Sequence, residues 1–400
     1  MMQKKQRNKK CLPTMTSLQR LVTASMGEEP DRVPVTGPFT LDWAWGQLYG
    51  ANSFADIGRD AEKLAKCMIW YSRDVGIDGI MALYSIYGVT HSITKQSGLT
   101  YSPLKWDNFV PTDPHSLYEG DFLEETAYGD PVIKTKEDAL KLKPADPYKD
   151  PDTTVLLKAI KIATKELGDE CLIAGSSDDI LSIISALMGW TQAFKAIIFK
   201  DPKYYETFTI VRDVVAQTMR TFCVEYLKAG AQAICGHTEL PHKEGAAAFL
   251  ANPDCVHLEL DLPCKLVEEC SKVKQFSYLL HICSVGPYDN GIGAWKELVK
   301  RLGPMVGFAI AEYGGAKTLV QFKKELAPAS ISGNIHPINT MLLGTPADVE
   351  AACVEAIRVA APGGRFMLGP GCMLPLEVPY ENVRAMVKTA ETYGKYPIKL

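Results

Sequence analysis

The chain has 400 residues, 46% of them hydrophobic and 22% charged, which is the composition of an ordinary globular protein. Its 43 Lys and Arg residues and 47 Asp and Glu residues give a net charge of −4, so we expect neither nucleic acid nor an anionic membrane as a partner. No apolar run has the roughly 18–20 residues of a membrane span, and no apolar stretch follows the basic N-terminus, so a secretory signal is not predicted.

The first predicted helix begins near Met15, where Thr16 and Gln19 have the spacing of a capping box. Residues 1–14 form a basic tail that we expect to be disordered, because it has little apolar content. After Met15, short apolar runs typical of strands alternate with amphipathic stretches typical of helices. The predicted strands are residues 32–37, 78–83, 171–175, 231–235, 277–283, 305–311, 329–333 and 365–369.

Helical patterns separate almost all of these strands. Two of the predicted helices also begin with a helix-start signal, since Thr345 precedes Pro346 and Asp201 precedes Pro202. Eight strands followed by helical sequence predict an α/β fold, a (β/α)8 TIM-type barrel over residues 15–400, although a doubly wound sheet would also alternate. The predicted helices are residues 54–75, 153–168, 178–227, 262–273, 293–302, 316–326, 346–361 and 380–394.

Residues 84–150 form an irregular insertion between the second and third strands, too long for a plain loop. Loops that follow strands build the active-site end of a barrel, so we expect a lid or wall over the site, with a surface decoration as the alternative. Aromatic residues after the first strand and in this insertion could line a pocket for a flat or apolar substrate, or pack the lid onto the barrel. They are Trp43, Trp45, Tyr49, Tyr84, Tyr87, Tyr101 and Trp106.

Polar residues just past the ends of the strands are the functional candidates in a barrel. Those that we expect to contact substrate are Asp42, Trp43, Tyr84, Asp178, Tyr313, Asn334 and His336.

The densest group of metal-ligand residue types is His281 and Cys283, which project to the same face of a strand. Cys372 follows the last strand in a glycine-containing turn that can aim its sulfur toward the barrel axis. One His and two Cys residues are a zinc ligand set that leaves one coordination position open. The alternative is that these three residues are unconnected core or loop residues.

His237 and Glu239 follow the fourth predicted strand with the same spacing of two residues. They could supply a fourth metal ligand or a general acid or base, or His237 could simply bond to a backbone carbonyl in its loop. Glu244 and Glu259 could instead form a carboxylate-rich metal set with His281, but such hard ligands suit zinc less well than thiolates do.

The sequence contains no Walker loop, no G-x-G-x-x-G after a strand, no G-x-S-x-G and no C-x-x-C pair, so nucleotide chemistry is not predicted. Its 11 scattered cysteines, without a signal sequence, argue against a disulfide framework. We therefore expect a reducing, cytoplasmic location.

Four segments resemble the uroporphyrinogen decarboxylase superfamily and together extend over most of residues 15–395. The first leads into strand one, the next two correspond to strand seven and its following helix, and the last is the C-terminal run. They are RLVTASMGEEPDRVPV (20–35), ISGNIHP (331–337), LLGTPADVEAAC (342–353) and GGRFMLGPGCMLPLEVPYENVRAMV (363–387).

Within that superfamily, the decarboxylases carry arginine after strand one, and the matching stretch here, TGPFTLDWAWGQ (36–47), has none. By resemblance, His281, Cys283 and Cys372 match the zinc pattern of the corrinoid-dependent methyltransferase branch. This chain departs from the pattern at His336, where the family more often has an acidic residue, and in HICSVG (281–286), which lacks the usual glycine after the Cys.

The resemblance implies a zinc-dependent methyltransferase that works with cobalamin carried by a separate corrinoid protein, since the chain has no D-x-H-x-x-G run. Its aromatic residues and the lack of Lys or Arg at the strand ends favour demethylation of a methoxylated organic compound. The alternatives are a methylcorrinoid:thiol methyltransferase of the coenzyme M type, a cofactor-free decarboxylase, and a non-catalytic corrinoid- or ligand-binding barrel. The resemblance leaves a homodimer open.

Overall fold

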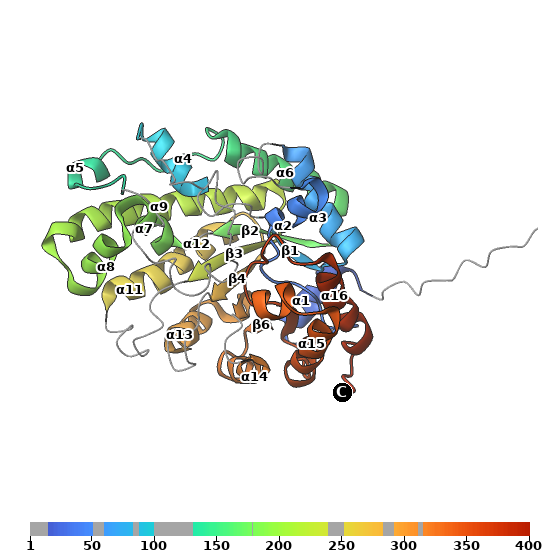
Figure 1. Cartoon of the computed structure of the whole chain (residues 1–400). Coiled ribbons are helices and arrows are strands. Elements are labelled where there is room, and N and C mark those ends of the chain that lie inside the picture. The colour runs from blue at the N-terminus through green and yellow to red at the C-terminus, as the bar shows by residue number, and fades with distance from the viewer. Residues whose placement is uncertain are drawn as a thin grey trace, which may run out of the picture.

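Seven parallel strands lie in sequence order in one sheet at the centre of the computed structural model (Figure 1). The structure describes residues 15–400 except 51–59, 83–87, 100–130, 178, 239–251, 283–291 and 311–314, so the predicted tail at residues 1–14 lies outside the described residues. Each strand begins and ends within three residues of its predicted range. The strands are β1 (Gly79–Ala82), β2 (Leu172–Ser177), β3 (Ala233–Thr238), β4 (Ser277–Ile282), β5 (Val306–Ile310), β6 (Ser330–Ile335) and β7 (Phe366–Pro370).

The first predicted strand joins the two edges of this sheet and closes it. Val35 forms a parallel bridge with Leu368 of β7, and Thr36 forms one with Gly79 of β1. Backbone hydrogen bonds run from Thr36 N to Leu368 O at 2.9 Å and from Asp78 N to Val35 O at 2.8 Å. The predicted (β/α)8 barrel is therefore confirmed, with its first strand reduced to isolated bridges.

A close backbone approach at this closure explains why residue 369 is glycine. A Cβ on Gly369 would lie 1.9 Å from the carbonyl oxygen of Thr36, so Gly369→Ala must push the two strands apart. We expect a loss of at least the roughly 1–3 kcal/mol typical of overpacking, measured by urea unfolding. Gly46→Ala is the control, since its Cβ would meet only Leu376 at 4.0 Å. Equal stability of the two variants would contradict this account.

Helix α1 (Ser17–Ser25) closes the N-terminal end of the barrel. It begins with the predicted capping box between Thr16 and Gln19. Leu21 and Ala24 then pack in one cluster with side chains inside the barrel, which are Met81, Leu172, Ala174, Ala233, Cys235 and Met367. Substrate access from this end is blocked by that packing.

A buried ion network holds the same end together. One oxygen of Asp78, Oδ1, accepts hydrogen bonds from Arg20 Nη1 and Ser17 Oγ, each at 2.7 Å. The other, Oδ2, accepts from Arg32 Nη1 at 2.8 Å and from Val35 N at 2.7 Å. Asp78 thus connects α1, the first strand and β1 through a single carboxylate.

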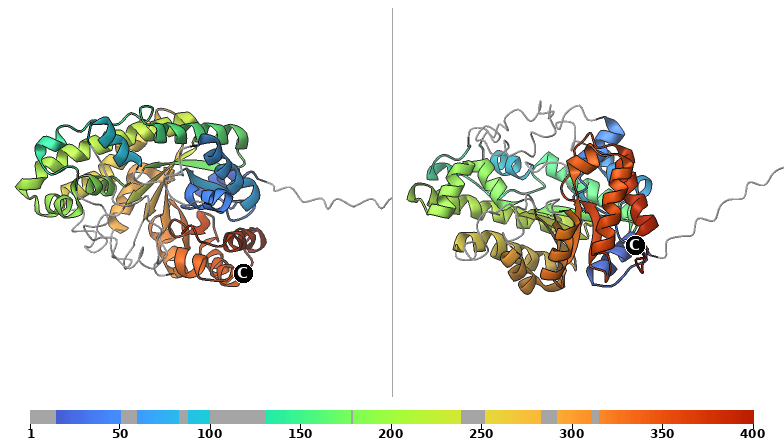
Figure 2. Two further views of the ribbon diagram at one scale, coloured as in Figure 1. Left: turned by 45° about the horizontal axis from the view of Figure 1, so that its top comes forward. Right: turned by 60° about the horizontal axis from the view of Figure 1, so that its bottom comes forward.

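Helices surround the strands on the outside, as both views in Figure 2 show. The segment 178–227, predicted as one helical pattern, is instead three helices, because the backbone turns left-handed at Gly189 (φ 85°) and Lys200 (φ 50°). The predicted starts at Asp201 and Thr345 are confirmed, since both side chains cap the helices that follow. The outer helices are α2 (Leu41–Tyr49), α3 (Ala61–Trp70), η1 (Tyr71–Val75), α6 (Pro151–Leu167), α7 (Ile180–Met188), α8 (Trp190–Phe199), α9 (Pro202–Ala229), α11 (Pro253–Val256), η4 (His257–Asp261), α12 (Leu262–Ser271), α13 (Ile292–Leu302), η5 (Gly303–Met305), α14 (Gly315–Glu325), η6 (Pro337–Leu342), α15 (Pro346–Ala360) and α16 (Tyr380–Tyr393).

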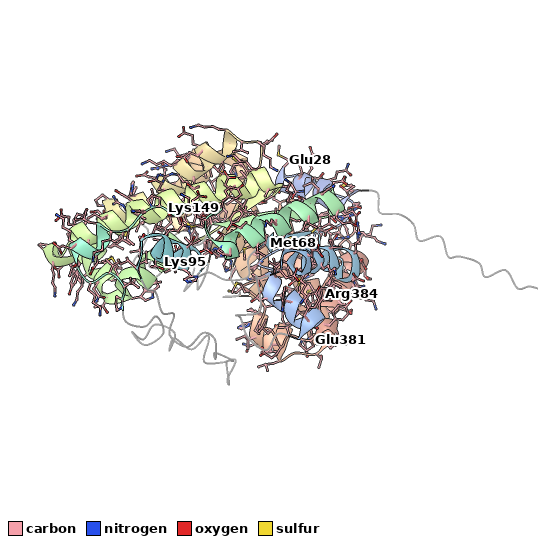
Figure 3. All side chains as sticks on the ribbon, turned by 90° about the horizontal axis from the view of Figure 1, so that it is seen from above. Glu28, Met68, Lys95, Lys149, Glu381 and Arg384 are labelled. Atoms are coloured by element: carbon pink, nitrogen blue, oxygen red, sulfur yellow. The ribbon has the colours of Figure 1, made fainter. Side chains whose placement is uncertain are left out.

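The last helix, α16, returns to the start of the barrel. Arg384, labelled in Figure 3, donates a hydrogen bond to the carbonyl oxygen of Val75 at the end of η1. Tyr380 Oη donates to the carbonyl oxygen of Asp74 at 3.4 Å. The C-terminal helix α16 is therefore packed against η1, the segment that leads into β1.

The described parts of the insertion are partly helical, which differs from the irregular structure predicted for residues 84–150. It contains α4 (Gly88–Gln96) and the short α5 (Lys136–Ala139). α4 contacts α6, α7 and α9, and α5 contacts α9, so both lie on the outer helical layer at the top of Figure 1. Residues 83–87 and 100–130, on which the predicted lid also depends, lie outside the described residues.

Among the described helices, none is by itself long and apolar enough to cross a membrane. The pair α7 and α8, bent by 117° at Gly189, meets the length and composition criteria only when its two helices are taken together.

Candidate active site

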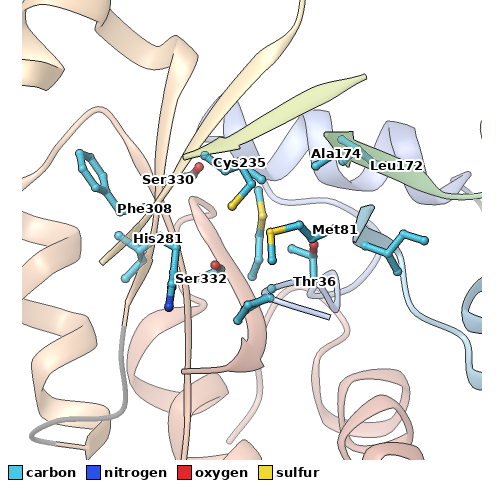
Figure 4. Close-up of a pocket in the computed structure, with 15 residues that line it drawn as sticks. Thr36, Met81, Leu172, Ala174, Cys235, His281, Phe308, Ser330 and Ser332 are labelled. Atoms are coloured by element: carbon cyan, nitrogen blue, oxygen red, sulfur yellow. The ribbon is translucent and has the colours of Figure 1, made fainter. Parts of the chain in front are cut away.

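Inside the barrel lies a small cavity of about 20 Å³, which is room for about one water molecule. Side chains along a strand alternate between its two faces, so every second residue points inward. Figure 4 shows the sulfur-bearing Met81 and Cys235 beside the cavity, whose polar members are Thr36, His281, Ser330 and Ser332. The interior is thus mainly apolar and becomes polar at His281, near the C-terminal end of β4.

His237 and His281 are brought together by the register of neighbouring strands. The pairing of β3 with β4 places them directly opposite each other. Their ring centroids are 5.4 Å apart, and the ring planes meet at 86°. Two of the predicted site residues therefore lie in contact inside the barrel.

The His237 ring is neutral at physiological pH. Burial and, to a smaller extent, the neighbouring His281 lower the pKa of His237 to about 3, and a hydrogen bond with the backbone of Ser177 acts in the opposite direction. A ring with so low a pKa is not protonated to the imidazolium form that a general acid requires at neutral pH. The structure therefore favours His237 as a hydrogen-bonding group or metal ligand over the general acid that the sequence left open.

A second cavity of about 20 Å³ adjoins His237 between the barrel and its helices. Asp179 and Glu259 contribute carboxylates to its wall. The sequence predicted Asp178 as a site residue, and that residue lies outside the described residues. Asp179 was not predicted. Its side chain accepts a hydrogen bond from Ser182 N at 2.6 Å and forms the N-cap of α7. The signal that could have identified Asp179 is its position directly before the apolar run of that helix.

The predicted zinc ligands are only partly described. His281 is buried on the inner face of β4, with 2% of its surface exposed. Cys283 is the next residue expected on that face and lies outside the described residues. Cys372 is half-buried two residues after β7, in a turn where Gly371 N donates to Ile335 O at 2.8 Å. Within the described ranges, no three His, Cys, Asp or Glu side chains are grouped closely enough to hold a metal ion.

Asn334 lies where the sequence predicted, at the C-terminal end of a strand. It is buried and pairs with Gly369 of β7. It is the second-to-last residue of β6. Its amide is therefore positioned near the barrel mouth as a candidate substrate contact.

His336 instead caps a helix. Its Nδ1 accepts hydrogen bonds from Ile338 N and Asn339 N, both at 3.1 Å, and its Nε2 lies 3.2 Å from Asn339 Nδ2. Both ring nitrogens are engaged in its own turn, which differs from the predicted contact with substrate. An Asp at this position could accept the same backbone bonds, which explains how a His replaces the acidic residue that the family pattern favours.

We expect His336→Ala to lower the free energy of unfolding by about 1 kcal/mol, the usual value of an N-cap, and His336→Asp to lower it much less. Burial lowers the pKa of His336 below its usual 6.5, so the unfolded chain binds this proton more readily. Stability from His336 is therefore complete above pH 6.5 and is lost as the pH falls below it. The free energy of unfolding is measured in urea at pH 7.5 and pH 5.5. Between these values the wild type should lose stability relative to His336→Asp. An equal difference between the two proteins at both pH values would contradict the cap.

Asp42 lies away from both described cavities because α2 begins at Leu41 and directs it toward α3. It accepts a hydrogen bond from the Thr40 hydroxyl and is close enough to Cys67 and Tyr71 for electrostatic interaction. Burial raises the pKa of Asp42 to about 6. This position differs from the barrel mouth, where the sequence predicted it.

Trp43 is part of the core. It is fully buried, stacks on Tyr71 with ring centroids 5.6 Å apart, and donates from Nε1 to the carbonyl oxygen of Val378 at 3.0 Å. Of the two functions left open for the aromatic residues after strand one, the structure assigns Trp43 to packing. The remaining predicted residues Tyr84, Asp178, Glu239 and Tyr313, and the alternative ligand Glu244, lie outside the described residues.

A family model described as Uroporphyrinogen decarboxylase (URO-D) matches residues 123–393. The chain is 24% identical over 382 residues to a methylcobamide:CoM methyltransferase, MtbA, of Methanosarcina acetivorans, with 94% of this chain and 98% of the relative covered. It is 26% identical over 254 residues to the methylcobamide:CoM methyltransferase MtaA of Methanosarcina barkeri, with 62% of this chain and 67% of the relative covered.

Among solved structures, a methyltransferase from Methanosarcina mazei superimposes with a TM-score of 0.68 at 20% identity. The alignment covers 94% of this chain and 98% of that one. At this level of identity the similarity concerns the fold, and it agrees with the closed barrel described above.

Proposed function

The chain belongs to the uroporphyrinogen decarboxylase (URO-D) family, and from that premise we propose that it transfers a methyl group from the corrinoid of a separate protein to a small thiol. The observation that carries this proposal is the similarity to methylcobamide:CoM methyltransferases over 94% of the chain. The predicted superfamily and its corrinoid-dependent methyltransferase branch are confirmed by these matches.

The direction of transfer is revised from the one that the sequence favoured. Demethylation of a methoxylated compound was expected from the aromatic residues, but Trp43 packs in the core. The relatives are named methylcobamide:CoM methyltransferases, and this name fits the alternative in which a thiol accepts the methyl group. We therefore propose the thiol as methyl acceptor and a methylated corrinoid protein as donor.

We propose that zinc is held by His281, Cys283 and Cys372. The fit rests on donor chemistry, since one imidazole and two thiols at strand ends are typical zinc ligands, and His281 is buried on the inner face. When bound, zinc would lower the pKa of a thiol ligand so that the thiolate is present near neutral pH.

The chain's own residues would position the thiol and exclude water. The apolar interior that includes Met81 and Cys235 closes the space below His281, and α1 blocks the far end. Ser332 lines the interior cavity and offers a hydroxyl there, and Asn334 lies near the end of the same strand as a candidate contact. The mouth of the barrel remains the side from which a corrinoid protein would approach.

The test is loss of methylcobalamin, followed by its absorption spectrum, when the protein is mixed with each member of a thiol panel. Neither described cavity is lined by Lys or Arg, so the panel should contain neutral thiols as well as those bearing sulfonate or carboxylate. We expect thiol-dependent demethylation of methylcobalamin. If no thiol reacts while reduced cobalamin accepts a methyl group from a methoxylated compound, the proposed direction is wrong.

A cofactor-free decarboxylase is the alternative that the family name suggests. The segment after the first strand forms the end of the barrel closure and α2, and it carries no arginine to bind substrate carboxylates. No observation on the described residues favours this function over methyl transfer.

A further inference from the structure

Three sulfur-bearing side chains meet inside the barrel. Met81 of β1, Cys235 of β3 and Met367 of β7 all line the interior cavity of about 20 Å³ and pack in one cluster. Their exposed fractions are 1%, 6% and 3%. Figure 4 shows the sulfurs of Met81 and Cys235 directed toward the same space. One thiol and two thioethers are therefore gathered around an open space to which the proposed function assigns no reactive group.

The space exists because small residues lie opposite the two methionines. Ala174 of β2 pairs with Met81, and Ser332 of β6 pairs with Met367, so the ends of the long methionine side chains have room beside them. Protein interiors are close-packed and contain few voids larger than a water molecule. Methionine usually fills irregular gaps in a core. Here two methionines instead leave a gap beside a thiol, which indicates a ligand rather than packing.

The chemistry of the sulfurs selects the class of ligand. Thiolate and thioether are soft ligands, and among biological metals they select Cu(I). A Cu(I) ion bound to one thiolate forms a neutral pair, so no net charge is buried. A divalent ion with the same single thiolate would leave one positive charge in mainly apolar surroundings, where an uncompensated charge is very costly. Both arguments favour a soft, monovalent cation.

We propose that the barrel interior binds one Cu(I) ion through the thiolate of Cys235 and the thioethers of Met81 and Met367. This inference goes beyond the proposed function and uses none of its zinc ligands, although His281 lines the same cavity. The ion would enter from the mouth of the barrel, since α1 closes the other end.

Binding exchanges a proton for the metal ion. The Cys235 thiol donates a weak hydrogen bond to the carbonyl oxygen of Gly236 at 3.7 Å. When Cu(I) binds, the S–H bond breaks, one copper–thiolate bond and two copper–thioether bonds form, and one proton passes to solvent. Copper stays in the Cu(I) state, so no oxidant or reductant takes part in the binding step.

The test uses the full-length chain as the Cys283→Ala, Cys372→Ala double variant, in which the thiols of the proposed zinc site cannot compete for copper. The protein is kept anaerobic with ascorbate so that copper remains Cu(I). Affinity and stoichiometry are measured by competition with a chromophoric Cu(I) chelator. X-ray absorption at the copper edge, on protein containing selenomethionine in place of methionine, detects thioether ligands directly as Cu–Se bonds.

Three further substitutions are made in this double variant. Cys235→Ser replaces the soft sulfur with a hard oxygen of similar size, whereas Met81→Leu and Met367→Leu keep the apolar volume and remove one thioether each. The matched controls are Cys255→Ser on α11 and Met386→Leu on α16, which remove buried sulfurs outside the cavity. Circular dichroism checks that each protein is folded.

We expect the double variant to bind one Cu(I) ion with one Cu–S bond and two Cu–Se bonds. Loss of a residue that only supports a metal ligand weakens binding about 10–100-fold. The dissociation constant of Cu(I) should therefore rise at least about 100-fold in Cys235→Ser and at least about 10-fold in each of Met81→Leu and Met367→Leu. Each of these two methionine variants should also lose one Cu–Se bond, and both controls should match the double variant.

Two results would overturn the site. One is a Cys235→Ser protein that binds Cu(I) as tightly as the double variant, and the other is a copper spectrum without Cu–Se bonds. If Cys235→Ser does not fold, the two methionine variants decide alone, and unchanged affinity with two Cu–Se bonds in both would refute the proposal. Methyl transfer by the copper-free wild type would support the proposed function in either case.

Discussion

Replacing Asp78 with Ala is expected to lower the free energy of unfolding by about 3–5 kcal/mol, the usual result of removing one partner from a buried ion pair. Asp78 is fully buried and Arg20 is 2% exposed. Without the carboxylate, Arg20 keeps its bonds to Asp31, at 2.6 and 2.9 Å, and to the carbonyl oxygen of Met15, at 3.0 Å. It loses its bond to Asp78, and Arg32 loses its ion pair with Asp78. The backbone N–H of Val35 also loses its acceptor. The measurement is urea unfolding at neutral pH.

Asp78→Asn should be less harmful than Asp78→Ala because it keeps the shape and one acceptor oxygen. The control is Glu268→Gln, which breaks an exposed pair with Lys272 at 3.4 Å and should change stability by less than about 0.5 kcal/mol. If Asp78→Ala cost no more than Glu268→Gln, the network would not be what joins α1 and the first strand to the barrel.

Replacing Cys372 with Ala is expected to remove most of the bound zinc and to lower the rate of methyl transfer at least about 100-fold. Loss of a residue that hydrogen-bonds to a metal ligand lowers metal affinity or activity about 10–100-fold, so loss of the ligand itself should lower them by at least about 100-fold. Cys372 is half-buried in a turn after β7, so the barrel should remain folded. Metal analysis, activity and circular dichroism check the three parts of this expectation.

Cys264→Ala is the matched control, since it removes a cysteine of the same half-buried class from the outer helix α12. It should keep both metal and activity. The double variant Cys283→Ala and Cys372→Ala provides the sharper test. Full zinc occupancy in that variant would contradict the assignment and favour the carboxylate set with Glu244 and Glu259.

The strands of the barrel could be predicted from the sequence alone because the signal for each is local. A buried parallel strand is a short apolar run between turn residues, and seven of the eight predicted runs appear as β1 to β7. The first is reduced to isolated bridges. The position of His281 at the inner face of β4 follows from the same two-residue alternation. Helix starts at Thr16, Asp201 and Thr345 were also visible, since capping depends on residues only a few positions apart.

Helix α2 could not be predicted in the same way. Its residues Leu41 to Trp45 are buried on every side, so the sequence shows no amphipathic period there. Asp42 and Trp43 were consequently expected at the mouth as loop residues, whereas the helix turns them into the packing with α3. The single helical pattern at 178–227 was divided by backbone turns at Gly189 and Lys200, which hydrophobic periodicity does not register.

The sequence by itself determined the barrel, and it predicted the end at which we expect chemistry and the candidate zinc residues, because each depends on neighbouring residues or on the order of strands. Only the tertiary structure placed Asp78 against Arg20 and Arg32, which are 58 and 46 positions away. The contact between His237 and His281, 44 positions apart, likewise depends on the register of two strands. Such contacts arise when barrel closure brings distant segments to one end, and no local pattern encodes which side chains will then meet.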